Sequence, residues 1–409
     1  MTVLKSDMKA LEKYSLESET SQTKTLEGLR KMVATPNFNP SSPKQVLKLL
    51  HILGEKKAES SDEKSLEAAR YKHPLNERIL GAILEYRGER KLSSTYLTTG
   101  EKAYEFGPAG KERILFSLNP HGTDTGRLAS KEHHFWCGLQ IQNIPAGTVV
   151  KETLVADEGW ELYEADLSQA EDRGVAYSSG DGSLLEVFSS GKDSHKLKAS
   201  MFFGVPYEDI TKDQRQLGKR INHGANYNMG AYVLVQTMGP KKVREAQKLL
   251  GLPKHWDLAG VANYLLNVYD KTFPVVKHEY YDSIILQVSK TRKLVGATGW
   301  TRYCFGDPKK NKLDLNAYVA HVTQSLNAMN LNKAFLAVFR ELGFHPDFKL
   351  IAQIHDSILF QVRKGRDDLA QRVAELMTFP VQVTDCFGVT REMIVPVDLK
   401  KLGSTWKGD

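Results

Sequence analysis

Four side chains that could together bind a nucleoside triphosphate recur at every fourth position between residues 213 and 230. They are Arg215, Lys219, His223 and Tyr227, and no proline interrupts the segment. On an α-helix this spacing places all four on one face. Phosphates prefer Arg and Lys as partners, and a base can stack on a flat ring, so this face suits a nucleoside triphosphate. A solvated basic helix would give the same pattern.

Two aspartates occupy positions where a divalent cation could bind. Asp166 falls near the end of a predicted buried strand, and a helix is expected to follow with Ser168 as its N-cap. Asp356 lies at the turn of a hairpin predicted over residues 348–362. Carboxylates at such positions suit hard cations such as Mg²⁺. Helix capping by Asp166, and the ordinary preference of hairpin turns for Asp, are the structural alternatives.

A turn-rich segment from residue 113 to 145 carries many amide and hydroxyl groups and few charges. Arg127 follows two threonines and a glycine, which suits a loop that presents a guanidinium to a nucleic-acid backbone or base edge. Gln140, Gln142 and Asn143 offer further hydrogen bonds. A polar loop without a ligand would have the same composition.

Composition favours a globular protein with a polyanionic partner. The chain has 409 residues, 41% of them hydrophobic, with a net charge of +7, and its pI is near 9.0. This length predicts two or three domains, or one large multi-lobed body. The cysteines are far apart and form no C-x-x-C pair, which argues against a zinc site and suits a reducing cytosol. No signal sequence or membrane span is apparent, so a cytoplasmic location, in a bacterium or an infected host, is expected.

Hydrophobic periodicity predicts the elements that must position these residues. Helices are expected to end at Gly54, to cover residues 74–97 and 317–342, and to dominate 231–290. A short hairpin is expected over 295–305, and a helix and a final strand after residue 362. Residues 1–38 are polar and are expected to form a mobile or marginal lead-in.

Taken in order, these segments resemble family A DNA polymerases, the class of bacterial DNA polymerase I and related phage replicative enzymes. The resemblance covers residue 39 to the C-terminus. Its first motifs are a thumb entry at residues 39–45 and a T-G-R and L-Q-N-I-P block at 123–130 with 141–145. The first catalytic motif follows at 166–173, the finger helix at 215–227 and the last motif at 355–356. Five motifs in the expected order make the resemblance specific.

The resemblance implies an α+β fold in which a helical thumb and helical fingers surround an antiparallel palm sheet, the right-hand polymerase fold. The implied parts are a lead-in (1–38), a thumb (39–112), a palm (113–180 and 310–409) and fingers (181–309).

The resemblance also implies DNA-templated addition of deoxynucleotides to a primer 3′ end by two-metal-ion phosphoryl transfer, with two Mg²⁺ ions or Mn²⁺ in their place. Asp166, Asp356 and the Leu167 carbonyl would bind metal, and Lys219 would protonate the departing pyrophosphate. The implied dNTP-binding residues are Arg215, Lys219, His223, Tyr227, Glu171 and Gln169, with Glu171 under the sugar. The implied DNA-binding residues are Arg127, Gln142, Asn143, Gln324 and His355.

Three positions depart from the family pattern. His223 replaces an aromatic Phe or Tyr, Leu167 replaces Tyr, and Ser357 replaces the Glu that commonly follows the catalytic Asp. Because histidine titrates near neutral pH, we expect pH-dependent nucleotide affinity and poor tolerance of altered sugars. We expect only a modest loss from Ser357, since two aspartates remain for the metals.

The expected partners are primer–template DNA, dNTPs and a separate exonuclease or processivity protein, with no membrane and a monomeric state. No 3′–5′ proofreading is expected in this chain, because only 165 residues precede Asp166. Two other functions remain open: an inactive nucleic-acid-binding scaffold with this fold, and a single-subunit RNA polymerase.

Overall fold

The computed structural model describes residues 3–70, 74–97, 113–131, 140–145 and 147–408. The chain forms two compact units. The first unit comprises residues 1–117, 130–162 and 402–409, and the second comprises 118–129 and 163–401. Both contain helices and strands, which agrees with the mixed α and β class expected from the sequence.

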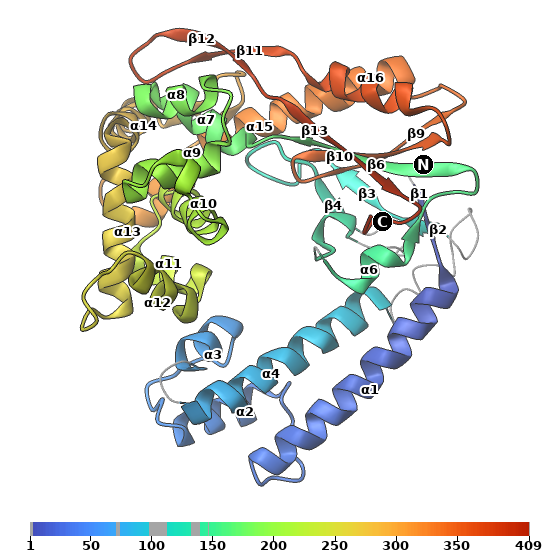
Figure 1. The fold of residues 1–409 in the computed structure, drawn as a ribbon, viewed down its shortest axis with the longest axis vertical. Coiled ribbons are helices and arrows are strands. Elements are labelled where there is room, and N and C mark those ends of the chain that lie inside the picture. The colour runs from blue at the N-terminus through green and yellow to red at the C-terminus, as the bar shows by residue number, and fades with distance from the viewer. Residues whose placement is uncertain (1–2, 71–73, 98–112, 132–139, 146, 409) are drawn as a thin grey trace. The chain divides into compact units, whose positions relative to one another are not determined.

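Four helices and one π-helical turn dominate the first unit. They are α1 (Met8–Met32), α2 (Pro43–Ile52), α3 (Glu63–Arg70), α4 (Pro74–Leu92) and η1 (Ser93–Leu97) (Figure 1). The Asp7 carboxylate caps α1 by accepting hydrogen bonds from two backbone N–H groups, and Ser42 with Pro43 starts α2. The predicted helix boundary at Gly54 is confirmed, since Gly54 has a φ of +97° just after α2.

Residues 1–38 do not form the marginal lead-in expected from their polar composition. Most of this segment is the 25-residue helix α1. Its buried Leu29 packs in one core with Phe38, Leu66 and Leu80 of the same unit. The expectation was wrong because α1 buries few residues, so its apolar stripe is sparse.

A small antiparallel sheet completes the first unit. Its central strand β1 (Val3–Ser6) pairs with β2 (Arg113–Leu115) and with β5 (Leu154–Val155). The short helices η2 (Ile141–Asn143) and α6 (Val149–Glu152) also belong to this unit. A further pair of strands, β3 (Ser117–Asn119) and β4 (Ala129–Lys131), lies where the chain passes between the units.

The main sheet has the order β13-β6-β10-β9, with β6 and β10 at its centre and the antiparallel hairpin β9–β10 on one side. These strands are β13 (Val397–Gly403), β6 (Trp160–Leu167), β10 (Ser357–Arg363) and β9 (Phe348–Ile354). Helices α15 (Lys312–Leu342) and α16 (Asp367–Met377) pack on the sheet through a core of aliphatic and aromatic residues. Two more hairpins belong to the second unit, β7–β8 (Lys293–Val295, Thr301–Tyr303) and β11–β12 (Pro380–Thr384, Thr390–Ile394).

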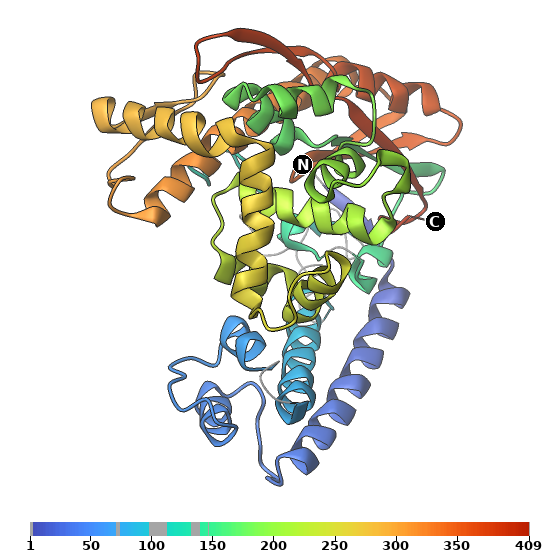
Figure 2. The ribbon, with the colours of Figure 1, turned by 60° about the vertical axis from the view of Figure 1, so that its left-hand side comes forward.

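The rest of the second unit is a helical group with its own core around Phe202, Leu265, Tyr269 and Phe273. Its members are α7 (Ala170–Ser179), α8 (Gly182–Ser189), α9 (Ser194–Phe203), η3 (Tyr207–Asp209), α10 (Lys212–Asn226), α11 (Ala231–Met238), α12 (Pro240–Leu249), α13 (Leu258–Thr272), η4 (Val276–Tyr280) and α14 (Tyr281–Thr291). Helices α9 and α10 lie side by side (Figures 1 and 2). No helix of the described residues is long and apolar enough to cross a membrane.

The structure confirms the strand that ends near Asp166, the hairpins predicted over 348–362 and 295–305 and the long helix that ends at residue 342. It corrects three other details. Ser168 is not an N-cap, because α7 begins after Gln169, whose side chain makes no cap hydrogen bond. Helix α10 ends at Asn226, so Tyr227 is its C-cap residue. The C-terminal region contains three strands after α16 rather than one.

His321 on α15 should make the stability of the second unit depend on pH. It is 0% exposed, and neither ring nitrogen has a hydrogen-bond partner among the described residues. Burial, with a smaller contribution from the charge of Arg302, lowers its pKa to about 4 from 6.5. The unfolded chain therefore binds a proton below pH 6.5 that the folded chain does not bind until about pH 4. This difference should reduce stability by on the order of 3 kcal/mol as pH falls from 7 to 4.

The test is chemical unfolding of the wild type and of His321→Leu at pH 7, 5.5 and 4. We expect the leucine variant to be at least as stable at pH 7 and to gain on the wild type as pH falls. Parallel pH profiles would show that His321 is not the group responsible.

Candidate active site

Pairing between β6 and β10 brings Asp166 and Asp356 to the same end of the main sheet. Asp166 is the penultimate residue of β6, and Asp356 directly precedes β10. The N–H of Leu167 donates to the carbonyl of Asp356 at 3.0 Å, which ties the end of β6 to the hairpin turn. Both carboxylates line one cleft of about 440 Å³ in the second unit. The structure thus places together two residues that are 190 positions apart in the sequence.

The cleft disfavours the ionisation of both aspartates. Burial, followed by the negative charges of Asp356 and Glu164, raises the pKa of Asp166 to about 6. Burial also raises the pKa of Asp356; the charge of Arg127 opposes this and that of Glu171 adds to it. A cation bound between the carboxylates would relieve this repulsion.

The oxygen atoms at this end of the sheet suit a hard divalent cation. Leu167, whose carbonyl is the third expected ligand, lines the same cleft as the two aspartates. No group of three or more His, Cys, Asp and Glu side chains arranged to hold a metal occurs in the part of the chain that the structure describes. A cation here would therefore need oxygens from the backbone, from water or from a substrate in addition to the two carboxylates.

Residues in the left-handed backbone region border the site. Gln169 has a φ of +54° just before α7, His355 has a φ of +51° just before Asp356, and Asn228 has a φ of +53° just after α10. Such conformations cost energy for a residue other than glycine and persist where the surrounding structure fixes them. The Gln169 side chain accepts a hydrogen bond from Ser194 at the start of α9. The exposed His355 lies on the hairpin turn.

Helix α10 presents two of the predicted cations and one ring to the cleft. It begins with a capping box formed by Thr211 and Gln214. Arg215, Lys219 and His223 all line the cleft. Arg215 Nε lies 2.9 Å from Oδ2 of Asp193, and Asp193 is the residue that caps α9. Lys219 is exposed and makes no hydrogen bond or ion pair with any residue that the structure describes.

The fourth residue of the predicted face, Tyr227, points to an acid instead. Its hydroxyl donates to Glu171, and Arg127 forms an ion pair with the same carboxylate. Burial and the neighbouring charge of Glu171 raise the pKa of Tyr227. The Arg127 guanidinium also lies 3.7 Å from Asp356. The rings of His223 and Tyr227 are 5.8 Å apart and nearly perpendicular.

None of the five predicted DNA-binding residues lines the cleft itself, although Arg127 contacts Glu171 and His355 precedes Asp356. Gln324 is partly buried on α15, one residue after Thr323. Gln142 and Asn143 belong to the first unit. There, Gln142 exchanges hydrogen bonds with Ser130, and the Asn143 carbonyl accepts from Tyr96 at 2.6 Å. Their role in DNA binding stays a prediction, as does the pH effect expected from His223.

Ser357 has a structural partner that its sequence position did not indicate. It is 1% exposed, and its hydroxyl donates to Glu164 at 2.7 Å and to the Ile354 carbonyl at 2.9 Å. A glutamate at this position would place a further buried negative charge beside Glu164 and near Asp166. Serine is therefore the residue that suits this site, because it supplies the donor that Glu164 accepts.

Sequence reasoning missed several residues that line the cleft: Ser168, Ala170, Asp172, His195, Asn222 and Asp398. Burial, the largest effect, lowers the pKa of His195 to about 4. The nearby cations Lys198, Lys219 and Arg215 contribute to this lowering of the pKa, and the charge of Asp172 opposes it. The ring is therefore neutral at pH 7, and its Nδ1 atom has no partner among the described residues. The available signal was a histidine two residues after Asp193, the residue that caps α9, because that position brings it to the helix N-terminus.

Three comparisons with known proteins agree with one another. The family model described as "DNA polymerase family A" matches residues 8–407. DNA polymerase I of Helicobacter pylori strain J99 is 29% identical over 368 residues, covering 85% of this chain and 36% of that protein. The thermostable DNA polymerase I of Thermus filiformis is 30% identical over 408 residues, covering 92% of this chain and 44% of that protein.

Among solved structures, the POL domain of Pol1 from M. smegmatis, in a complex with DNA primer-template and dNTP, has a TM-score of 0.79. It is 24% identical, and the match covers 99% of this chain and 67% of that one. This likeness confirms the fold class expected from the sequence. The chain spans less than half the length of the two curated relatives.

Binding of a polyphosphate to the α10 cations can be measured without any reaction. Tripolyphosphate should raise the melting temperature of the full chain, because Arg215 and Lys219 are cations beside an anion-sized cleft. Lys219→Gln should remove more than half of this increase. Lys241→Gln on α12 is the matched control, since that lysine is exposed and does not line the cleft. Equal losses in the two variants would indicate non-specific polyanion binding by a solvated basic surface.

Proposed function

The chain belongs to DNA polymerase family A, and we propose on this basis that it is a DNA-templated DNA polymerase. It would add deoxynucleotides to the 3′ end of a primer. The observation that carries the proposal is the cleft in which Asp166 and Asp356 lie opposite the Arg215 and Lys219 of α10. Acids for metal ions and cations for phosphates are the two sets of groups that phosphoryl transfer needs.

The two aspartates and the Leu167 carbonyl would hold two Mg²⁺ ions, or Mn²⁺ in their place. When bound, the ions would activate the primer hydroxyl and stabilise charge on the transferring phosphate. Asp166 and Asp356 would be ionised in that state, because a neighbouring divalent charge lowers the pKa of a carboxylic acid. The β6–β10 pairing keeps both carboxylates in place before any ligand arrives.

The cations of α10 would hold the triphosphate of the incoming dNTP. Arg215 would leave Asp193 for the β- and γ-phosphates, and Lys219 would give a proton to the departing pyrophosphate. The neutral ring of His195 could donate one hydrogen bond to a phosphate oxygen without adding charge. Gln169, held by Ser194, lines the same cleft.

Glu171, Tyr227 and His223 would shape the space for the sugar and the base. Glu171 is held from two sides, by Arg127 and by Tyr227. A carboxylate fixed in this way would occupy the space that a 2′-hydroxyl needs, which favours deoxynucleotides. His223 is exposed at the cleft and would stack beside the incoming base.

The DNA would be contacted by Arg127, His355 and Gln324 in the second unit and by Gln142 and Asn143 in the first. In the sequence-based domain scheme, residues 39–112 with α2–α4 are the thumb and 181–309 with α8–α14 are the fingers. Residues 113–180 and 310–409, which contain the main sheet, are the palm.

Primer extension on a recessed duplex with Mg²⁺ tests the function directly. We expect the wild type to extend the primer with dNTPs and to discriminate against ribonucleotides. Asp356→Asn should reduce extension roughly 10³-fold or more, because one metal carboxylate is lost. A wild type that binds DNA without extending it would indicate a binding scaffold. Efficient ribonucleotide use would indicate an RNA polymerase.

Asp193 should weaken nucleotide binding in the wild type. Its carboxylate neutralises Arg215 and would repel a triphosphate. Asp193→Asn keeps an N-cap for α9 but removes the charge, so we expect the KM for dNTP to fall several-fold with little change in stability. Asp193→Ala is the control, because it also removes the cap. A higher KM in the asparagine variant would mean that Asp193 positions Arg215 productively.

A further inference from the structure

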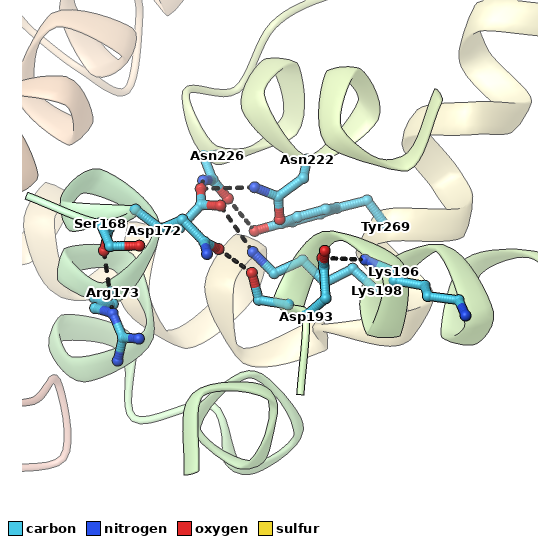
Figure 3. Close-up of polar contacts among 11 residues, drawn as sticks. Ser168, Asp172, Arg173, Asp193, Lys196, Lys198, Asn222, Asn226 and Tyr269 are labelled. Carbon is cyan, nitrogen blue, oxygen red and sulfur yellow. Dashed lines mark hydrogen bonds and ion pairs between the residues drawn. The ribbon is translucent and has the colours of Figure 1, made fainter. Parts of the chain in front are cut away.

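A buried polar network centred on Asp172 joins four helices beside the cleft (Figure 3). The Asp172 carboxylate, on α7, accepts from Lys198 of α9 at 2.8 Å. It also accepts from Asn222 and Asn226 of α10, each at 2.6 Å. Tyr269 of α13 then donates to Asn226 at 2.6 Å. One carboxylate thus anchors residues of two other helices directly and a residue of a third helix through Asn226.

The charges of this network are shielded from water. The Lys198 side chain is 1% exposed and that of Asp172 is 12% exposed. Burial alone would raise the pKa of Asp172. The charge of Lys198 and the hydrogen bonds of the network outweigh this effect, so the net result is a lowered pKa. A buried ion pair contributes little net stability, because desolvation offsets the attraction. Its more distinctive effect is to fix one arrangement of the groups around it.

The orientation of both asparagines follows from the chemistry of their partner. A carboxylate only accepts hydrogen bonds, so each amide nitrogen must face Asp172. The Asn226 oxygen then faces the Tyr269 hydroxyl. Asn222 lines the cleft beside His223 and is 1% exposed. The carboxylate therefore sets the rotamers of two residues on α10.

The network is located where it can set the rotation of α10 about its axis. Asp172 holds Asn222 and Asn226, while the adjacent Glu171 holds Tyr227. Two consecutive acids of α7 therefore bind two residues in the last part of α10 and its C-cap residue, Tyr227. The same helix carries Arg215, Lys219 and His223, so rotation of α10 would move all three away from Asp166 and Asp356.

We propose that Asp172, with Lys198, is a positioning residue that fixes the rotation of α10 and thereby aims its cations at the metal carboxylates. This inference rests on the proposed polymerase function for its kinetic consequence. Asp172 itself touches neither the primer nor the reacting phosphate in this scheme. Because a misplacement of about 1 Å can cost about 100-fold in rate, a loosened α10 should impair incorporation of a nucleotide even when the fold is intact.

The decisive variant replaces both charges together, Asp172→Leu with Lys198→Met. Removing only one partner would leave an uncompensated buried charge, whereas an apolar pair of similar volume often preserves stability. The double variant leaves Asn222 and Asn226 without their acceptor. We expect a folded protein with a lower melting temperature than the wild type, because two buried amides lose their acceptor, together with faster amide exchange in α10 and a Kd for dNTP raised about tenfold in single-turnover incorporation.

Two further variants separate charge from hydrogen bonding. Asp172→Asn with Lys198→Gln keeps polar groups that can still form the hydrogen bonds, so its Kd should lie closer to that of the wild type. Tyr269→Phe removes the last link and keeps the ion pair, so it should change exchange and Kd in the same direction by less. If the Asp172→Leu, Lys198→Met variant fails to fold, the test is the comparison of amide exchange and Kd between these two further variants and the wild type.

Asp385 and Arg391 provide the matched control. They form an ion pair in the second unit, with the Asp385 side chain 0% exposed. The following residue, Cys386, donates to Ser178 at the other end of α7 from Asp172. Asp385→Asn with Arg391→Met should reduce stability without changing amide exchange in α10 or the Kd for dNTP. An equal effect in this control would show that general destabilisation accounts for the kinetics.

The outcomes also separate this inference from the proposed function. A folded leucine and methionine variant with wild-type exchange in α10 and wild-type kinetics would overturn the positioning role. A wild type that incorporates no nucleotide would overturn the proposed function. Exchange in α10, which needs no substrate, would still support or refute control of that helix by Asp172.

Discussion

The site depends on two partly buried carboxylates, Asp166 and Asp356, that line one cleft. Burial raises the pKa of both Asp166 and Asp356, and the charge of Asp356 raises that of Asp166 further, so the protein must hold the two acids together against repulsion. It does so with backbone hydrogen bonds, since Leu167 donates to the carbonyl of Asp356 itself. Strand pairing is well suited to this task, because its hydrogen bonds are unaffected by ionisation of the side chains.

A helix that carries cations poses a different problem, because it must be aimed as well as formed. Capping and periodicity make α10 a helix, but they do not determine which direction its charged face points. Two adjacent acids of α7 meet that need by binding residues near the end of α10. Within residues 166–172, Asp166 lines the cleft, whereas Glu171 and Asp172 also hydrogen-bond to residues at the end of the neighbouring helix.

The sequence revealed the local geometry of the site and the pairing of its aspartates, but not the partners of most charges. Spacing predicted that Arg215, Lys219 and His223 share a face, and apolar runs predicted the hairpin at Asp356. The Arg215–Asp193 and Ser357–Glu164 contacts could not be predicted from spacing, since they depend on how elements distant in sequence pack together. Helix α1 was missed because its apolar stripe is sparse, and the left-handed Gln169 was missed because its conformation follows from its surroundings.

Because Arg127 is covalently attached to the chain, its positive charge is permanently part of the site. Its guanidinium pairs with Glu171 and lies 3.7 Å from Asp356, so it serves as a built-in counterion for the acids. Free sodium or potassium would compensate these carboxylates to an extent that varies with ionic strength. A tethered guanidinium has a fixed local concentration instead. The ligand-free arrangement of this acidic cluster is thereby buffered against the salt content of its surroundings, while association with a polyanion remains strongly salt-dependent.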